Sequence, residues 1–176
     1  MANNNQNPMR NLKIEKLTLN IGAGKDQARL EKGMKLLKNI TGVQPLKNVT
    51  QKRIQAWGLR PGLPVGTKIT IRGEKARELI DRLLQAKERK LKPNNFDNEG
   101  NVAFGIHEYI DVPGVKYDPE IGITGFQICI TLERPGYNLK KRRLHSMPIP
   151  KRHRITKQDA IDFMQKQFNI SVIGDE

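Results

Sequence analysis

The chain has 176 residues, of which 32 are Lys or Arg and 18 are Asp or Glu, so its formal net charge is +14. Only 36% of the residues are hydrophobic. No apolar run approaches the roughly 18 residues of a membrane span, and the Asn-rich start has no apolar stretch for a secretory signal. The single cysteine, Cys129, excludes an intrachain disulfide and a multi-cysteine zinc site. We therefore expect a soluble cytoplasmic protein with a polyanionic partner and no membrane partner.

Positive charge is concentrated in two segments that contain no acidic residue. Nine bases lie between Glu31 and Glu74, and nine more lie in residues 134–158, whereas residues 93–133 carry seven acids and one base. A single basic run is typical of an ordinary solvated surface. Two such segments beside an acidic one favour a nucleic-acid surface, because mixed charges would serve solubility equally well.

Apolar periodicity predicts an alternation of strands and helices. The first half begins with a strand over residues 12–21, a turn over 22–24 and a helix capped by Asp26 and closed by Gly42. A weak strand over 46–51, a loop rich in Gly and Pro over 57–66, a strand over 67–72 and a helix carrying Ala76 to Leu84 follow. The second half has a turn over 94–101, strands over 102–106 and 126–132, a basic arm, and a helix capped by Thr156.

These elements predict an α+β fold, with a mostly antiparallel sheet, helices packed on one face, a basic C-terminal arm and a terminal helix. That arrangement would leave the other sheet face open. The arm contains two prolines and few apolar residues, so we expect it to be extended, without a core of its own. We divide the single domain, residues 1–176, into a flexible N-terminus (1–8), a main body (9–133), the arm (134–155) and the terminal helix (156–170).

Motifs for catalysis and metal binding are incomplete. Residues 22–25 read Gly-Ala-Gly-Lys between a strand and a helix, but Leu19 and Asp26 stand where a phosphate loop needs Gly and Ser or Thr. His107 and the acid that follows it would point to opposite faces of a strand. Cys129 has no base near it in sequence. We expect no enzymatic activity, no cofactor and no metal.

One candidate nucleic-acid surface is the outward face of the predicted sheet. Lys68, Thr70 and Arg72 share one strand face, and Thr18 and Asn20 share the corresponding face of another strand. Such side chains bond to phosphates and 2′-hydroxyls, which suits structured RNA recognised by its shape. An ordinary solvent-facing sheet has the same alternation, so this pattern is compatible with both interpretations.

The loop over residues 53–66 is a second candidate surface. It combines Arg53 and Arg60 with the only tryptophan, Trp57, and with glycines that allow close backbone approach. The indole either stacks on a base or sugar or anchors the loop to the core, and the sequence favours neither. The basic stretch over residues 134–157, which includes the arm, has the composition of a segment that becomes ordered only on an RNA surface.

Four ordered motifs carry a resemblance to a known family. They are Leu17–Gly24, Ile40–Pro45, Pro61–Gly73 and Asn94–Glu108. In order and spacing these motifs are similar to the large-subunit ribosomal protein L-five family, which binds 5S ribosomal RNA. The resemblance covers residues 9–133, the family core. The missing N-terminal extension of the bacterial branch, and the basic arm with its last helix, resemble the archaeal form.

The resemblance implies an α+β sandwich in the central protuberance that helps attach 5S rRNA to the large subunit. It also implies a reach toward the P-site tRNA and the small subunit. Asn20 and Thr70 match two family positions that bind 5S rRNA. At a third position, where the family has Gln after Thr-Gly, this chain has Val43, and we assign the role to the following Gln44. The loop Ile54–Gly66 corresponds to the tRNA-facing loop of the family.

These observations predict three groups of functional residues and a set of ribosomal partners. The rRNA-binding group comprises Asn20, Gln44, Lys47, Asn48, Lys68, Thr70 and Arg72. The tRNA-facing loop presents Arg53, Trp57, Arg60 and Pro61. The basic arm, whose contact with large-subunit rRNA is inferred from charge, presents Lys140, Lys141, Arg142, Arg143, Lys151, Arg152 and Arg154. Neighbouring ribosomal proteins of the large and the small subunit complete the expected partners, in cytoplasmic ribosomes.

Two other classes of protein fit part of the pattern. A DNA-compacting or general nucleic-acid-binding protein would use the basic surface on deformable duplex without a unique site. A basic nuclease would require metal-dependent cleavage, for which the sequence supplies no residue set.

Overall fold

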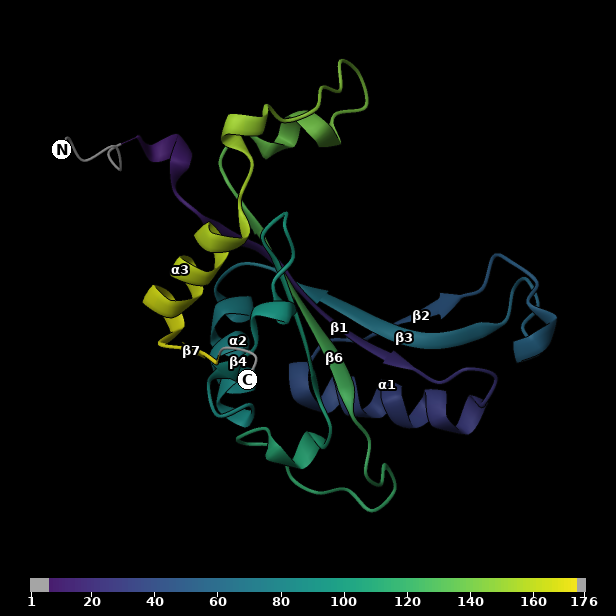
Figure 1. Cartoon of the computed structure of the whole chain (residues 1–176). Coiled ribbons are helices and arrows are strands. Elements are labelled where there is room, and N and C mark those ends of the chain that lie inside the picture. Colours follow the sequence, from purple (N-terminus) through teal and green to yellow (C-terminus); the bar gives the residue numbers. More distant parts are fainter. Residues whose placement is uncertain (1–6, 174–176) are drawn as a thin grey trace.

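The computed structural model describes residues 7–173, and these form an α+β fold with a five-stranded antiparallel sheet (Figure 1). The strand order is β2-β3-β1-β6-β5. The strands are β1 (Lys13–Gly22), β2 (Leu46–Val49), β3 (Pro64–Ile71), β5 (Asn101–Ile106) and β6 (Phe126–Glu133). The predicted flexible N-terminus, residues 1–8, lies outside the described residues except for Asn7 and Pro8, which begin a short 3-10 turn.

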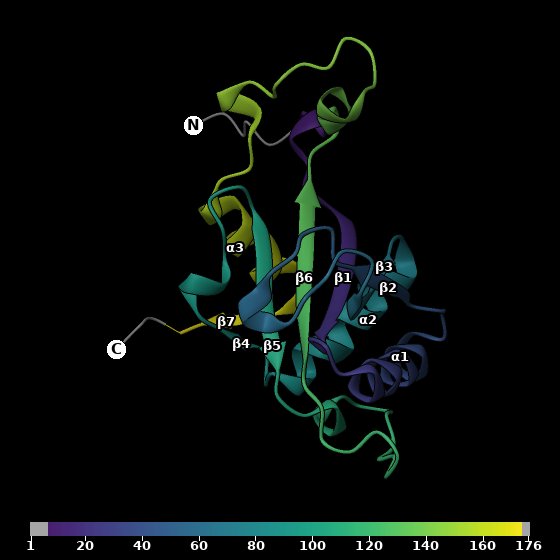
Figure 2. The same ribbon diagram turned by 90° about the vertical axis from the view of Figure 1, so that its right-hand side faces the viewer.

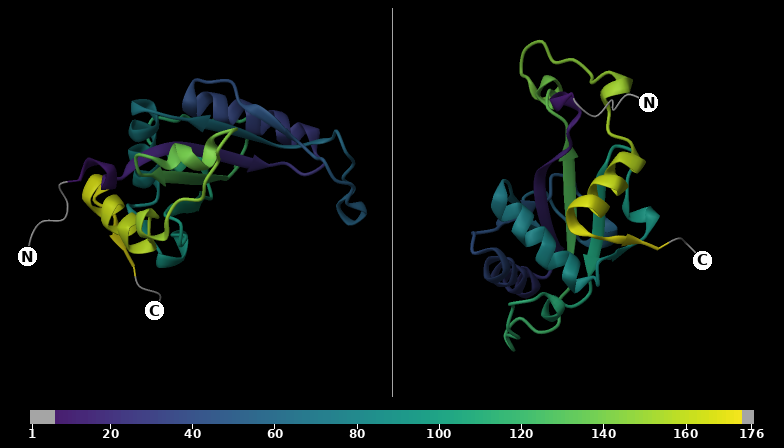
Figure 3. Two further views of the ribbon diagram at one scale, coloured as in Figure 1. Left: turned by 90° about the horizontal axis from the view of Figure 1, so that it is seen from above. Right: turned by 90° about the vertical axis from the view of Figure 1, so that its left-hand side faces the viewer.

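Three α-helices of the described chain cover one face of the sheet, as the right panel of Figure 3 shows. They are α1 (Gln27–Thr41), α2 (Glu74–Ala86) and α3 (Lys157–Phe168). The Asp26 carboxylate accepts two backbone N–H bonds in the first turn of α1, and Gly42 ends that helix at a φ of 70°. Thr156 and Asp159 form a reciprocal capping box at the start of α3. None of the helices within residues 7–173 is long and apolar enough to cross a membrane.

Strand alternation places the apolar side chains on the helix side of the sheet. Leu17, Leu19 and Ile21 of β1 are at most 3% exposed and pack with the apolar faces of α1 and α2. β6 buries every second residue in the same way, from Phe126 to Leu132. Because successive strand residues point to opposite faces, the polar residues between them must face away from the helices.

A second, two-stranded sheet was not predicted from the sequence. β4 (Lys90–Leu91) pairs in parallel with β7 (Ser171–Val172). Strands this short show no periodicity, so no sequence pattern reveals them. The pairing fastens the segment after α3 to the segment after α2.

Two projections extend from the sheet toward the side that the helices leave uncovered (Figures 1 and 2). One is the hairpin of β2 and β3, whose tip lies well beyond the other strands. The other is the arm, residues 134–155, which rises from the end of β6. The uncovered sheet face therefore lies between two protruding segments.

The arm differs from the extended, coreless segment that we predicted. Tyr137, Ile149 and Ile155 are buried and belong to the main hydrophobic cluster of the protein. The chain also forms 3-10 turns at Tyr137–Lys141 and Lys151–His153. The buried apolar residues of the arm lie toward its two ends, where the arm meets the core, whereas Leu144 and Met147 in its middle are exposed.

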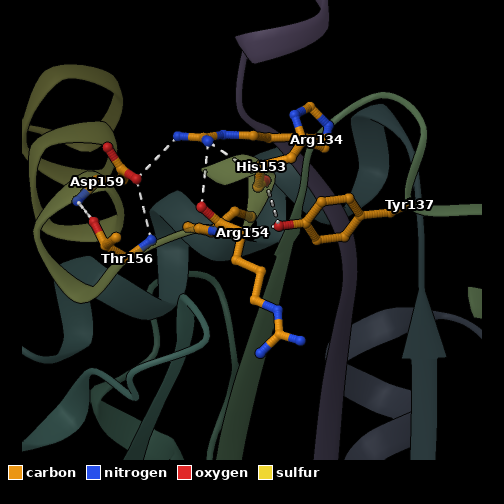
Figure 4. Close-up of polar contacts among 7 residues, drawn as sticks. Arg134, Tyr137, His153, Arg154, Thr156 and Asp159 are labelled. Carbon is orange, nitrogen blue, oxygen red and sulfur yellow. Dashed lines mark hydrogen bonds and ion pairs between the residues drawn. The ribbon is translucent and has the colours of Figure 1, made fainter. Parts of the chain in front are cut away.

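Polar contacts clamp the two ends of the arm together (Figure 4). The buried Arg134 donates from Nη1 to two backbone carbonyls at the far end of the arm, at 3.3 and 3.5 Å, and from Nη2 to the Asp159 carboxylate at 2.9 Å. The Tyr137 hydroxyl donates to the carbonyl of His153 at 3.2 Å and accepts from the N–H of Ile155 at 2.9 Å. Burial raises the pKa of this hydroxyl, which keeps it protonated. The clamp holds the arm in one place.

Removing the Asp159 carboxylate should lower the free energy of unfolding by about 2 to 3 kcal/mol. Asp159→Ala leaves the Arg134 guanidinium without its ionic partner and removes one half of the α3 capping box. Asp162→Ala is the matched control, because that carboxylate accepts only an exposed bond from Gln158, and it should cost about 0.5 kcal/mol or less. Urea unfolding measures both variants. Equal costs would show that the clamp does not stabilise the fold.

Candidate nucleic-acid interface

The sheet face opposite the helices is solvent-exposed, and we call it the open face (Figure 2). Asn20 in β1 lies opposite Lys68 of β3 on one side and Gln127 of β6 on the other. The open face comprises Lys16, Thr18, Asn20, Leu46, Asn48, Lys68, Thr70, Asn101, Ala103, Gly105, Gln127, Cys129, Thr131 and, at the end nearest the arm, Glu133. The acid in this set, Glu133, is paired with Lys13 and Lys141. The rest of the face therefore presents donors and acceptors to a polyanion without a negative charge that would repel it.

Side-chain amides form a chain across three strands of the open face. Asn48 of β2 donates from Nδ2 to Oδ1 of Asn20 at 3.4 Å. Asn20 donates in turn from its own Nδ2 to Oε1 of Gln127 at 3.3 Å. Each amide retains further donors or acceptors for a ligand. Because Asn20 is bonded on both sides, its orientation is set before any ligand arrives.

Charge is distributed unevenly over the open face. Lys68 lies on β3, Arg72 follows directly after that strand, and Lys16 lies on the neighbouring strand β1, so the bases lie on the β1 and β3 side of the face. Thr18 has the uncharged neighbours Thr70 and Cys129 on its two sides. β5, at the far edge, places Ala103 and Gly105 on this face, and these small residues allow a sugar-phosphate backbone to approach closely.

The acids at the end of the sheet nearest the arm are neutralised by ion pairs. Lys141 of the arm contacts Glu15 at 2.5 Å and Glu133 at 3.5 Å, and Lys13 also pairs with Glu133 at 3.0 Å. Partial burial alone would raise the pKa of Glu15, but the hydrogen bond and charge of Lys141, with smaller effects from other bases, lower that pKa below its usual value. The same hydrogen bond raises the pKa of Lys141. These charges tie the arm to β1 and β6.

Two of the predicted rRNA-binding residues lie away from the open face. Lys47 lies opposite Thr67, which is fully buried and faces α1, so Lys47 lies on the helix side of β2. Together with Gln44 and with Lys35 and Lys38 of α1, it lines a shallow groove of about 380 Å³. The structure thus brings together Asn20, Asn48, Lys68, Thr70 and Arg72 and separates Gln44 and Lys47 from them.

The tip of the β2–β3 hairpin is an ordered structure. Ile54 and Leu59 exchange two backbone hydrogen bonds, at 2.9 and 3.1 Å, around a 3-10 turn that contains Trp57. The indole of Trp57 is 68% exposed, so the interpretation in which it anchors the loop to the core is wrong. Arg53 and Arg60 are also exposed, as is Pro61. The tip therefore exposes an aromatic ring and two cations.

Most of the predicted arm bases face solvent. Arg142, Arg143, Lys151 and Arg152 are exposed and have no carboxylate partner among the described residues. The other three make contacts within the protein. Lys140 lies 5.9 Å from the ring centre of Tyr137, Lys141 pairs with acids of the sheet, and Arg154 donates from Nε to the carbonyl of Ile149 at 3.1 Å.

Sequence reasoning missed the contribution of β6 to this surface. Gln127 and Thr131 flank the open-face thiol of Cys129, and Gln127 completes the amide chain. The alternation of apolar and polar residues in the sequence predicts that both side chains face away from the core. Their position beside Asn20, however, depends on the pairing of β6 with β1. Within residues 7–173 no cluster of three or more His, Cys, Asp or Glu side chains could hold a metal ion.

Comparisons with known proteins identify the family of the chain. Two family models match consecutive parts of the chain, one described as "Ribosomal protein L5" over residues 7–60 and one that describes the C-terminus of the same ribosomal family over residues 64–163. Proteins named "Large ribosomal subunit protein uL5" are similar over nearly their whole length. The relative from Sulfurisphaera tokodaii is 45% identical over 95% of both chains. That from Nanoarchaeum equitans is 44% identical over 96% of this chain and 99% of its own, and that from Nitrosopumilus maritimus is 42% identical over 98% and 99%. The chain therefore belongs to the ribosomal protein L5 family.

Proposed function

We propose that the protein is a structural constituent of the large ribosomal subunit that binds 5S rRNA through its open face. In this role it helps attach 5S rRNA to the large subunit in the central protuberance. Membership of the family, and relatives named as large-subunit proteins, support the ribosomal role. The observation that carries the RNA assignment is the open face with its oriented amides and with its acid paired to lysines.

The residues of the open face suit RNA more than duplex DNA. The 2′-hydroxyl of a ribose both donates and accepts hydrogen bonds, and it lines the wide, shallow minor groove of an RNA helix. The amide of Asn20 and the hydroxyl of Thr70 can each bond to such a group from a flat sheet. Lys68 and Arg72, at the β3 side, would bond to phosphates. Uncharged residues would then select the site, and the bases would strengthen binding.

The two projections have separate partners in this proposal. The hairpin tip, with Trp57 between Arg53 and Arg60, reaches the P-site tRNA, where the exposed indole stacks on a base or sugar. The exposed bases of the arm contact large-subunit rRNA. Neighbouring ribosomal proteins of the large and the small subunit contact the remaining surface.

Asn20→Ala combined with Thr70→Ala should weaken binding of folded 5S rRNA about tenfold or more, because hydrogen bonds to the RNA are lost without a change in charge. Asn39→Ala with Gln167→Ala is the matched control, since both residues are exposed on helices away from the open face. Filter binding measures the dissociation constants. If the double open-face variant bound like the control, the open face would not be the RNA site.

Replacing Arg142, Arg143, Lys151 and Arg152 by Gln should flatten the salt dependence of binding to large-subunit rRNA. Each lost phosphate contact should reduce the slope of log K against log salt by about 0.7 to 0.9. The control replaces four exposed helix bases, Arg29, Lys32, Arg77 and Lys166, and so removes the same charge elsewhere. Dissociation constants at several salt concentrations give the slopes. An unchanged slope in the arm variant would mean that the arm does not touch phosphate.

Competition separates this proposal from a general nucleic-acid-binding protein. Folded 5S rRNA should displace a bound RNA probe far better than duplex DNA of equal length, because only the folded RNA fits a unique site. Equal displacement would favour the general binder.

A further inference from the structure

A pocket lies where the open face meets the arm. Its volume is about 460 Å³, and its walls come from the end of β5 and β6, from the turn before β5 and from the arm. Thr131 belongs to the open face and also lines this pocket, as does Asn101, its partner in β5. A ligand on the open face therefore has direct access to the pocket.

The walls of the pocket are held in place from both sides. In the turn, the Asp97 carboxylate accepts from the N–H of Glu99 and from Nδ2 of Asn101, both at 2.7 Å. Gly100 has a φ of 83°, and a Cβ on it would collide with the side chain of Ile155 in the arm. The C-terminal end of the arm, at Ile155, thus packs tightly on the turn before β5. The pocket is preformed, and binding there would require little reorganisation.

The chemistry of the lining is that of a site for one nucleotide. Leu132, Ile149 and the ring of Tyr137 provide apolar and aromatic surface for the faces of a base. At the edge of a base, the amide of Asn98 can both donate and accept hydrogen bonds, and the carboxylate of Glu99 can accept them. A volume of this order is typical of small-molecule pockets, and a base paired in a duplex cannot enter it.

Positive charge at the pocket suits the phosphate of that nucleotide. Arg154 is fixed through its Nε bond to the carbonyl of Ile149, at 3.1 Å, and its terminal nitrogens point away from the clamp in Figure 4. These nitrogens have no carboxylate partner among residues 7–173. Lys140 also lines the pocket. The carboxylate of Glu15, which would repel a phosphate, is neutralised by Lys141.

We propose that this pocket takes one unstacked nucleotide of the RNA that lies on the open face. The inference rests on the proposed function, because it needs RNA on that face. Sequence-specific RNA recognition usually targets bases that are splayed out of the helix, where both the face and the edge of the base can be read. The pocket would give the protein a contact that depends on an unpaired base, in addition to contacts with the helical backbone.

The test fills the pocket without changing charge. Asn98 is exposed and its side chain has no hydrogen-bond partner within the described chain, so both Asn98→Trp and Asn98→Ala should fold. Filter binding with folded 5S rRNA should show about a tenfold loss for Asn98→Trp, because the indole occupies the space of the base, and at most about a threefold loss for Asn98→Ala. Thermal unfolding checks that both variants are folded.

A second pair of variants keeps the test decisive if the tryptophan variant does not fold. Arg154→Met should weaken binding more than Arg152→Met, although each removes one positive charge from the arm, because only Arg154 lines the pocket. If wild-type protein prefers folded 5S rRNA but Asn98→Trp binds as tightly as Asn98→Ala, the pocket assignment is wrong and the proposed function stands. If wild-type protein shows no preference for folded 5S rRNA over duplex, the proposed function itself fails.

Discussion

The pairing of β1 with both β3 and β6 is the constraint on which the rest of the structure depends. β1 is the central strand, and its alternation sends Leu17 and Leu19 toward the helices and Thr18 and Asn20 toward solvent. A slip of one residue would exchange these two sets, so burial of the leucines specifies the register. The same register aligns Asn20 with Lys68 and Gln127. The hydrophobic core and the open face are thus two consequences of one set of hydrogen bonds.

Charge and hydrogen bonding have different roles in this arrangement. The centre of the open face is uncharged, and its amides are oriented by one another, which suits selection of a site by shape. The bases lie on β1 at Lys16, at the β3 side, on the hairpin tip and on the arm. The clamp around Arg134 and Tyr137 reduces the conformational entropy that the arm would lose on binding, because both of its ends are already fixed. The excess of positive charge is therefore held in defined positions.

Much of this surface follows from sequence periodicity, and the remainder depends on tertiary structure. The outward parity of Asn20 and Thr70, the helix caps at Asp26 and Thr156, and the open face itself were predictable because they follow from local periods and capping rules. The contact between Asn20 and Gln127 joins residues 107 positions apart and leaves no local signal. The arm was predicted to lack a core of its own because it contains two prolines and few apolar residues. Its buried residues, Tyr137, Ile149 and Ile155, join the main hydrophobic cluster through tertiary contacts that leave no local signal.

The single cysteine is the most direct probe of RNA binding on the open face. Cys129 is exposed and lies at the centre of the open face, between Thr18 of β1 and Ala103 of β5. The rate at which it reacts with a thiol reagent can be measured in the free protein and with saturating folded 5S rRNA. If the RNA lies on the open face, 5S rRNA should slow this reaction strongly, whereas duplex DNA of equal length should not. An unchanged rate at saturating 5S rRNA would contradict the claim that the RNA lies on the open face.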